Sequence, residues 1–314
     1  MTLSLEKINY QGWSNCYRLA NNLVQLVATT DVGPRIIRFG FAGGGNEFAE
    51  FPESLGQTGG ETWRVYGGHR LWHAPEAVPR TYYPDNQAIA LAEHDGFIRL
   101  IQPTETTTGI QKEMDIRLAP DAARVVVTHR LYNRNPWQVE LAPWALSVMR
   151  PGGTAVIPLP PRGVHPQDLL PTSSIILWPY SHMSDPRWTW GGQYVLLRQD
   201  AGRPQPQKAG VRASDGWIAY ANEGHLFVKT FAYVAGADYP DLGSSVEMFT
   251  NAEMIEIETL GPLTPLEPGT AVTHTETWHL FDDVPLPHSE SEVNSAIIPK
   301  INSIRAERGR QPGS

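Results

Sequence analysis

Apolar side chains recur at every second position over long parts of the chain, which is the period of a β-strand. From Ile110 to Leu118 the apolar residues alternate with glutamine, glutamate, aspartate and arginine. The segment from Val125 to Tyr132 repeats the pattern, and His129 falls in phase with its apolar residues. We therefore expect two strands that each bury one face, with His129 as a hydrogen-bonded histidine of the core.

Turn signals divide the rest of the chain into further short strands. Asp31-Val-Gly-Pro34 and Asn222-Glu-Gly224 separate apolar runs and predict a turn and a hairpin. No long helical pattern precedes Pro285, and no repeat with a period of about 20 to 50 residues is present. Further strands are expected at residues 23–28, 35–39, 139–149, 155–158, 194–197, 217–220, 226–234 and 272–281.

These patterns predict one all-β domain, a mostly antiparallel sandwich over residues 1–284. The character of the chain changes from Pro285 onward. Ser289 is a candidate helix cap, and the basic end contains glycine and proline. We expect residues 285–314 to form a docked helix and a frayed tail.

Residues 239–262 concentrate acidic side chains on one expected strand. Glu256 and Glu258 share one face, while Ile255 and Ile257 share the other. At about 3.3 Å rise per residue, the two carboxylates start about 7 Å apart, close enough to disfavour each other's ionisation on a shielded face. That arrangement suits a general base, and a solvated acidic strand face is the alternative.

The segment from Thr62 to Glu76 is a candidate pocket wall. Gly67 and Gly68 allow close approach of the backbone, and tryptophan, tyrosine, histidine and arginine side chains surround them. This mixture is typical of a surface that stacks on sugar rings and hydrogen-bonds to hydroxyl groups. A packed aromatic loop with hydrogen-bonded histidines is the structural alternative.

The same segment does not predict a metal site. His69, His73 and Glu76 would lie near one another on a helix, as metal ligands can. The flanking glycines and Pro75 disfavour that helix. We therefore expect no metal and no other cofactor.

Two further stretches carry candidate chemistry. Residues 158–190 are rich in proline and aromatics without a clear period, and a long irregular stretch in a compact domain is often a functional rim. In the expected strand 272–281, His274 and Glu276 share a face with apolar residues. This pattern suggests a half-buried strand near a polar cavity, although an exposed face would give the same pattern.

Composition restricts the class of ligand. The 314 residues include 27 prolines, 28 glycines and 10 tryptophans with only 18% charged residues, which favours an all-β chain. A net charge of −8 without an internal basic run argues against nucleic acid or an anionic membrane as partner and is compatible with a neutral polyol. Cys16 is the single cysteine, so no intrachain disulfide forms. Without a leader-like start or a long apolar run, we expect a soluble, cytoplasmic protein.

The order of four motifs resembles the galactose mutarotase-like superfamily, which includes aldose 1-epimerases and hexose-phosphate mutarotases. Gly33-Pro-Arg-Ile-Ile37 is similar to the early Gly-Gly-Arg-Ile strand of that family, and Arg64 to Pro75 resembles its Gly-Gly cleft loop. Ala142 to Ser147 stands where the family has a histidine-bearing strand, and Ile257-Glu-Thr259 resembles the strand that carries its glutamate base. The resemblance spans roughly residues 1–283 and implies a β-supersandwich.

By this resemblance Glu258 takes the role of the general base. The family's general acid is a histidine on the strand that corresponds to residues 142–147, and no histidine is present there. His69 and then His73 are the substitutes, because each can titrate near neutral pH in the candidate pocket wall. Candidate sugar contacts are Arg35, Arg64, Arg70, Trp72, Arg80, Asp241, Glu247 and Glu256.

Three functions remain open at this point. The first is exchange of sugar anomers by acid–base ring opening. The second is binding or sensing of a carbohydrate without catalysis. The third is cleavage of a glycoside by paired carboxylates in an inverting geometry, which two glutamates on one strand rarely provide. The partner in each case is a small sugar or sugar derivative, and the protein would act as a monomer or homodimer.

Overall fold

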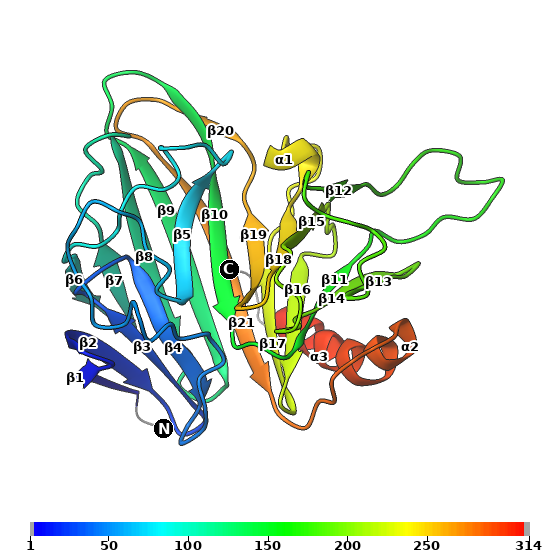
Figure 1. The fold of residues 1–314 in the computed structure, drawn as a ribbon, viewed down its shortest axis with the longest axis horizontal. Helices are drawn as coiled ribbons and strands as arrows, with labels where there is room; N and C mark the ends of the chain where they lie inside the picture. Colours follow the sequence, from blue (N-terminus) through cyan, green and yellow to red (C-terminus); the bar gives the residue numbers. More distant parts are fainter. Residues whose placement is uncertain (1–2, 311–314) are drawn as a thin grey trace.

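The computed structural model describes residues 3–310 as two large antiparallel sheets packed face to face (Figure 1). The predicted antiparallel β-sandwich is confirmed. In spatial order the 11-stranded sheet contains β1 (Ser4–Tyr10), β2 (Trp13–Ala20), β3 (Val24–Thr29), β4 (Arg35–Phe41), β5 (Gly68–Ala74), β10 (Val139–Met149), β19 (Ile255–Leu260), β18 (Val246–Thr250), β15 (Gln207–Val211) and β12 (Ile175–Leu177), with β20 (Thr264–Leu266) paired to β10.

The second sheet has ten strands and contributes the other half of the core. In spatial order these are β13 (Trp188–Trp190), β14 (Tyr194–Arg198), β11 (Thr154–Pro158), β16 (Trp217–Asn222), β17 (His225–Phe231), β21 (Ala271–Phe281), β9 (Arg124–Asn133), β8 (Ile110–Leu118), β7 (Phe97–Ile101) and β6 (Ala90–His94). The helical segments are α1 (Pro240–Gly243), α2 (Glu290–Glu292), the π-helical turn η1 (Val293–Ile297) and α3 (Ile298–Arg310).

The main hydrophobic core lies between the two sheets, and the alternation of side chains decides which residues enter it. Ile255 and Ile257 of β19 are fully buried in this core, so Glu256 and Glu258 point to the outer face of the 11-stranded sheet. His129 is also fully buried in phase with its apolar neighbours, and the backbone carbonyl of His274 accepts a hydrogen bond from its Nδ1 at 2.9 Å. Both assignments were predicted from the period of two.

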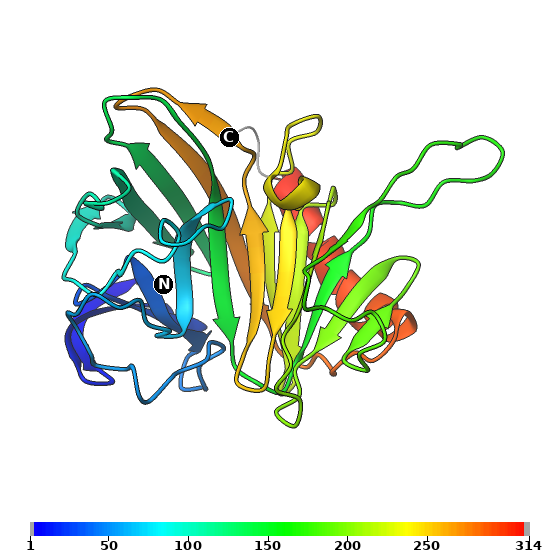
Figure 2. The same cartoon turned by 45° about the horizontal axis from the view of Figure 1, so that its top comes forward.

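Local turn and cap chemistry follows the sequence signals. Glu223 and Gly224 have φ values of 50° and 83°, which suit the tight hairpin between β16 and β17. The side chain of Ser289 accepts a hydrogen bond from the backbone N–H of Glu292 and caps α2. Ile297 and Ile304 pack on the outer face of the ten-stranded sheet, which the C-terminal helix covers in Figure 2. Within residues 3–310, no helix is long and apolar enough to cross a membrane.

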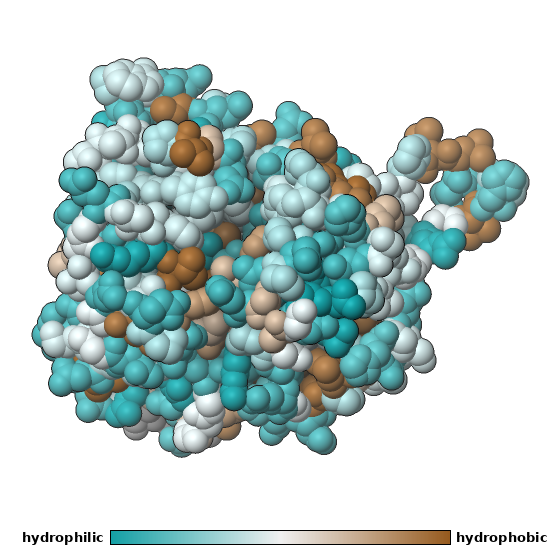
Figure 3. Space-filling view, viewed as in Figure 1, coloured by the Kyte–Doolittle hydropathy of each residue, from teal (hydrophilic) through white to brown (hydrophobic). Residues whose placement is uncertain are grey.

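The irregular part of the chain contains two short edge strands, β12 and β13, and a segment that projects from the body. Residues 159–174 form this projection, seen at the right of Figures 1 and 3. Brown patches on it mark exposed apolar side chains, of which Leu169 and Leu170 are 73% and 83% exposed. The chain then returns to the sheet through β12 and the aromatic segment that follows it.

A cluster of ionisable side chains lies inside the core between the sheets. His69 Nε2 lies 2.7 Å from His129 Nε2, and His69 Nδ1 lies 2.8 Å from the Ser147 hydroxyl. Burial lowers the pKa of both imidazoles, which favours their neutral forms. A neutral His129 that donates its Nδ1 proton to the carbonyl accepts at Nε2, so His69 donates from Nε2.

One buried ion pair completes this inner cluster. Lys229 of β17 lies 3.0 Å from Glu276 of β21, and both side chains are fully buried. The Lys229 ammonium also donates to the carbonyl oxygens of Ala145 and Ile257 at 3.3 Å each. The ten-stranded sheet is thereby tied to β10 and β19 in the opposite sheet. His274 lies beside this pair, and burial lowers its pKa to about 3.

Protonation of His274 is expected to destabilise the fold below neutral pH. Its pKa is about 3 when folded and about 6.5 when unfolded, so the unfolded chain binds the extra proton first and stability is lost as pH falls below about 6.5. We expect His274→Gln to remove this dependence. Between pH 7 and 5 the free energy of unfolding of the unmodified protein should fall by about 2 kcal/mol relative to the variant.

Urea unfolding at several pH values measures this difference. His69 and His129 are present in both proteins, so their contributions cancel. A constant difference between the two proteins from pH 7 to 5 would show that the pKa of His274 is the same in the folded and unfolded states.

Candidate functional site

A cavity of about 210 Å³ lies on the outer face of the 11-stranded sheet. Strands β5, β10, β19, β18 and β15 form its floor, and they lie side by side in Figure 2. Segments on either side of β5 and the chain after β12 form its walls. The lining residues are Trp63, Val65, Arg70, Trp72, Glu76, Tyr82, Trp144, Leu146, Tyr180, Lys208, Phe249, Met254 and Glu256.

Glu258 occupies the centre of this floor. Its register partners are Leu146 on β10 and Glu247 on β18, and Glu256 lies two residues away on the same strand face. Leu146 and Glu256 line the cavity, whereas Glu258 is fully buried. The Glu258 carboxylate therefore lies one layer beneath the cavity surface.

Two donors hold the Glu258 carboxylate in place. Trp144 donates its Nε1 proton to Oε2 at 2.7 Å, and the Lys208 ammonium lies 3.0 Å from the same oxygen. The other oxygen, Oε1, is buried without a hydrogen-bond partner among the described residues. An unpaired buried acceptor costs about 1–3 kcal/mol, so this oxygen would gain from a ligand hydroxyl.

Lys208 joins Glu258 to a second carboxyl group. Its ammonium lies 2.8 Å from Glu247 and contacts the ring faces of Trp144 and Trp178 at 4.6 and 4.7 Å. Burial alone would lower the pKa of Lys208, but Glu247 and Glu258 together raise it above its usual value. Lys208 therefore carries a positive charge in the wall of the empty cavity.

For Glu247, burial affects the pKa more than the attraction of Lys208 does. Its side chain is fully buried, and burial raises its pKa well above the ordinary value against the attraction of Lys208. The neighbouring carboxyls of Glu258 and Asp241 raise it further. One ammonium faces several carboxyl groups here, which favours the protonated form of Glu247.

A second ion pair lies on the other side of the floor. The Arg70 guanidinium is 2.9 Å from Glu256, and it stacks on the Trp72 ring at 4.4 Å. Both charged side chains line the cavity and are largely buried. This pairing fixes the orientation of Glu256.

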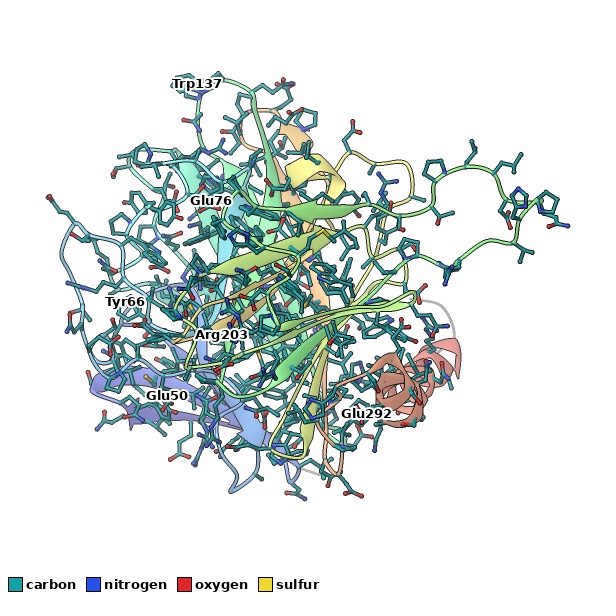
Figure 4. All side chains as sticks on the ribbon, turned by 45° about the vertical axis from the view of Figure 1, so that its right-hand side comes forward. Glu50, Tyr66, Glu76, Trp137, Arg203 and Glu292 are labelled. Carbon is teal, nitrogen blue, oxygen red and sulfur yellow. The ribbon has the colours of Figure 1, made fainter. Side chains whose placement is uncertain are left out.

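Aromatic side chains form the walls in contact with one another. Trp72 packs against Trp63, Tyr82 and Trp144 with ring centroids 5.1–5.4 Å apart. The Tyr82 hydroxyl donates to the carboxylate of Glu76, which lies just beyond the end of β5 in Figure 4. Burial and this bond raise the pKa of Tyr82 to about 12. The cavity thus offers flat apolar faces beside hydroxyl and carboxylate groups.

The structure places His69 and His73 away from this cavity. Residues 68–74 form strand β5, so Arg70 and Trp72 face the cavity while His69 and His73 face the opposite way. His69 belongs to the inner cluster. His73 lines a separate hollow of about 370 Å³ and lies 3.7 Å from Glu105. Neither histidine can therefore donate a proton to a ligand bound over Glu258.

Four other candidate contacts lie outside the cavity lining. Arg35 is buried in an ion pair with Asp85 at 2.7 Å. Arg64 donates to the carbonyl of Gly59 at 2.7 Å, and Arg80 lines the separate hollow with His73. Asp241 lies on α1 next to Glu247. Of the candidate contacts, Arg70, Trp72 and Glu256 line the cavity, and Glu247 lies beneath it.

Sequence reasoning missed Lys208, Trp144 and Tyr180. Lys208 sits in a short segment with no clear period, and its partner Glu258 is 50 residues away. Trp144 lies within residues 142–147, where the family resemblance predicts a histidine and assigns no role to a tryptophan. Tyr180 lies within residues 158–190, which were predicted as a rim, so the irregular composition did carry that signal.

The inner cluster also offers a set of metal-ligating atoms. Ligand atoms of His69, His129 and Glu276 lie within 4.8 Å of one another. The Lys229 ammonium 3.0 Å from Glu276 already supplies positive charge in the same space. A metal ion would meet that charge in a medium of low polarity, which disfavours its binding while Lys229 is protonated.

Comparison with known proteins defines the fold class. No protein-family model and no curated protein sequence matches the chain. A galactose mutarotase-like protein from Lactobacillus casei matches 85% of this chain over 100% of its own, at 10% identity and a TM-score of 0.55. One from Clostridium acetobutylicum matches 89% over 99%, at 11% identity and a TM-score of 0.54. A galactose mutarotase related enzyme from Lactobacillus acidophilus matches 87% over 100%, at 10% identity and 0.52.

The chain therefore has the fold of the galactose mutarotase-like proteins. This confirms the β-supersandwich fold that the resemblance implied. At identities of 10–11% the similarity establishes the fold, and the activity has to be argued from the cavity itself.

The protonation state of Glu247 can be tested without a ligand. A carboxyl group with a raised folded pKa contributes stability that is lost as pH rises above its unfolded pKa of about 4.3. Glu247→Gln keeps the shape and removes the titration. We expect the free energy of unfolding of the unmodified protein, relative to the variant, to fall by about 1.4 kcal/mol per pH unit from about pH 5 upward.

Chemical unfolding at pH 5, 6 and 7 measures this slope. The slope should vanish at the pH where folded Glu247 also ionises. A difference that stays constant from pH 5 to 7 would instead indicate that Glu247 is already ionised in the folded state.

Proposed function

We propose that the protein binds a monosaccharide in this cavity and exchanges its anomers, with Glu258 as the general base. The observation that carries the proposal is the state of the Glu258 carboxylate. It is held by Trp144 and Lys208 at the centre of the cavity floor, and its Oε1 has no hydrogen-bond partner among residues 3–310. A positioned carboxylate of this kind can accept the proton of an anomeric hydroxyl.

The chemistry requires one proton to leave and one to arrive. Glu258 takes the proton from O1, the bond between C1 and the ring oxygen O5 breaks, and C1=O1 forms. O5 takes a proton from an acid as its bond to C1 breaks. Rotation about C1–C2 and the reverse transfers close the ring on the other face, so no proton is gained or lost overall.

The walls suit a small sugar. The volume of about 210 Å³ lies below the roughly 300–1,000 Å³ of sites for drug-sized ligands, which fits a single ring. Trp63, Trp72 and Trp144 contribute aromatic surface to the lining, against which the apolar side of a sugar ring can pack. Glu76, Tyr82 and Glu256 add hydrogen-bonding groups around them.

The charges of the cavity favour a neutral ligand. The two cations, Arg70 and Lys208, are each already paired with carboxylates. A phosphate group would have to displace these partners, and Glu76 adds further negative charge to the wall. We therefore expect hexoses to bind more tightly than hexose phosphates.

Full burial of Glu258 supports a second function, sugar binding without catalysis. If Lys208 and Trp144 never uncover the carboxylate, the anomeric hydroxyl cannot reach it. Sugar binding without faster anomer exchange is the result that selects this function.

Replacement of Glu258 distinguishes base catalysis from binding. Glu258→Gln removes the ionisable base and keeps the shape, so anomer exchange should fall by about 10² or more while sugar affinity changes little. Saturation-transfer NMR on glucose, galactose and their 6-phosphates measures the exchange. Tryptophan fluorescence measures binding, because three tryptophans line the cavity.

The matched comparison is Glu256→Gln, on the same strand face. Glu256 pairs with Arg70 and lines the cavity, so its loss should raise KM more than it lowers kcat. Equal exchange rates in Glu258→Gln and the unmodified protein would rule out Glu258 as the base.

A further inference from the structure

We propose that Lys208 is the proton donor of this site and that Glu247 replaces the proton that Lys208 gives up. The inference rests on the proposed anomer exchange, and it supplies the acid that residues 142–147 do not provide. Lys208 would touch the sugar, and Glu247 would act through Lys208.

The first part of the proposal, that Lys208 donates a proton to the sugar, rests on the position of this residue. It lines the cavity on the far side of the floor from the Arg70–Glu256 pair, and its ammonium lies 3.0 Å from the Glu258 carboxylate. A sugar whose anomeric hydroxyl reaches Glu258 therefore brings its ring atoms close to Lys208. Contacts with the Trp144 and Trp178 rings hold the ammonium in place.

The second part of the proposal, that Glu247 supplies a proton, rests on the number of carboxyl groups around Lys208. One ammonium contacts two carboxyl groups, Glu247 at 2.8 Å and Glu258 at 3.0 Å. Glu258 has a second donor in Trp144, which stabilises its negative charge. The other neighbour of Glu247 is Asp241, a carboxyl group that cannot stabilise a second negative charge. Of the two partners of Lys208, Glu247 is thus the one that holds a proton.

The proton transfers balance when the three groups act together. As the bond between C1 and O5 breaks, its electron pair goes to O5, which takes a proton from Lys208. Glu247 then passes its proton to the resulting amine, while Glu258 holds the proton from O1. Ring closure runs both transfers in reverse and restores one ammonium, one carboxylic acid and one carboxylate.

Proton transfer from Glu247 to Lys208 explains how an ammonium that binds its proton tightly can act as an acid. Glu247 and Glu258 hold the pKa of Lys208 above its ordinary value, so an isolated transfer to O5 would be uphill. The carboxylic acid beside it returns the proton at once. The net donor is then Glu247, a carboxylic acid whose pKa burial raises above its ordinary value.

Replacement of Lys208 by arginine separates charge from proton transfer. Lys208→Arg keeps the cation, but a guanidinium does not lose its proton. We expect anomer exchange on glucose or galactose to fall by about 10², with sugar affinity changed by less than about tenfold. The control is Lys112→Arg, a buried lysine that is 2.6 Å from Glu105 and outside the cavity, which should exchange anomers at the unmodified rate.

Glu247→Gln tests the proton source. This test does not depend on whether the protein still folds with a substitution at residue 208. In the unmodified protein kcat/KM should decline as pH rises through the raised pKa of Glu247. In the variant this alkaline decline should disappear, and the rate at pH 7 should fall about tenfold or more. The charged or titratable groups that face Glu247 are Lys208, Glu258, Asp241 and Tyr180, and all four remain in the variant.

The outcomes distinguish this inference from the function on which it rests. Exchange at the unmodified rate in Lys208→Arg, or an unchanged alkaline decline in Glu247→Gln, overturns the proton-donor assignment and leaves Glu258 as base. Absence of exchange by the unmodified protein on every sugar overturns both. Loss of exchange in Lys208→Arg together with loss of the alkaline decline in Glu247→Gln supports the assignment.

Discussion

The central strands of the 11-stranded sheet have two faces, and both must be shielded from water. The inner face packs on the ten-stranded sheet, and the outer face carries the cavity. Because side chains alternate strictly along a strand, neighbouring residues are assigned to different environments. In β5 this constraint sends His69 inward and Arg70 outward, and in β19 it sends Ile257 inward and Glu258 outward.

On each face of the sheet, the buried charged side chains lie close to partners of opposite charge. The inner face holds Lys229 against Glu276, and the outer face holds Lys208 against Glu247 and Glu258. Removing a charge from water costs several kcal/mol, which only a close partner and further hydrogen bonds offset. The inner pair is balanced one to one, whereas the outer group has an additional acid. This excess of acid distinguishes the outer group from the inner pair.

The sequence predicts the strands well because a period of two is a local property. The same property places Glu256 and Glu258 on a common face before any tertiary contact is known. The composition of residues 62–76 predicts a loop, whereas residues 68–74 form a strand, so His69 and His73 turn away from the cavity. The pairing of Lys208 with Glu258 joins residues 50 positions apart, and no local pattern encodes such a contact.

The two halves of the site have different structural origins. Glu258 and Glu247 lie on central strands that are fixed by pairing on both sides. Trp178 and Tyr180, which cover Lys208, belong to irregular chain that follows an edge strand of three residues. Insertions and substitutions are tolerated far better in an irregular segment of this kind than in a paired strand. Substitutions at Trp178 or Tyr180 can therefore change which ligand fits the cavity while the paired strands keep the charged side chains beneath it in place.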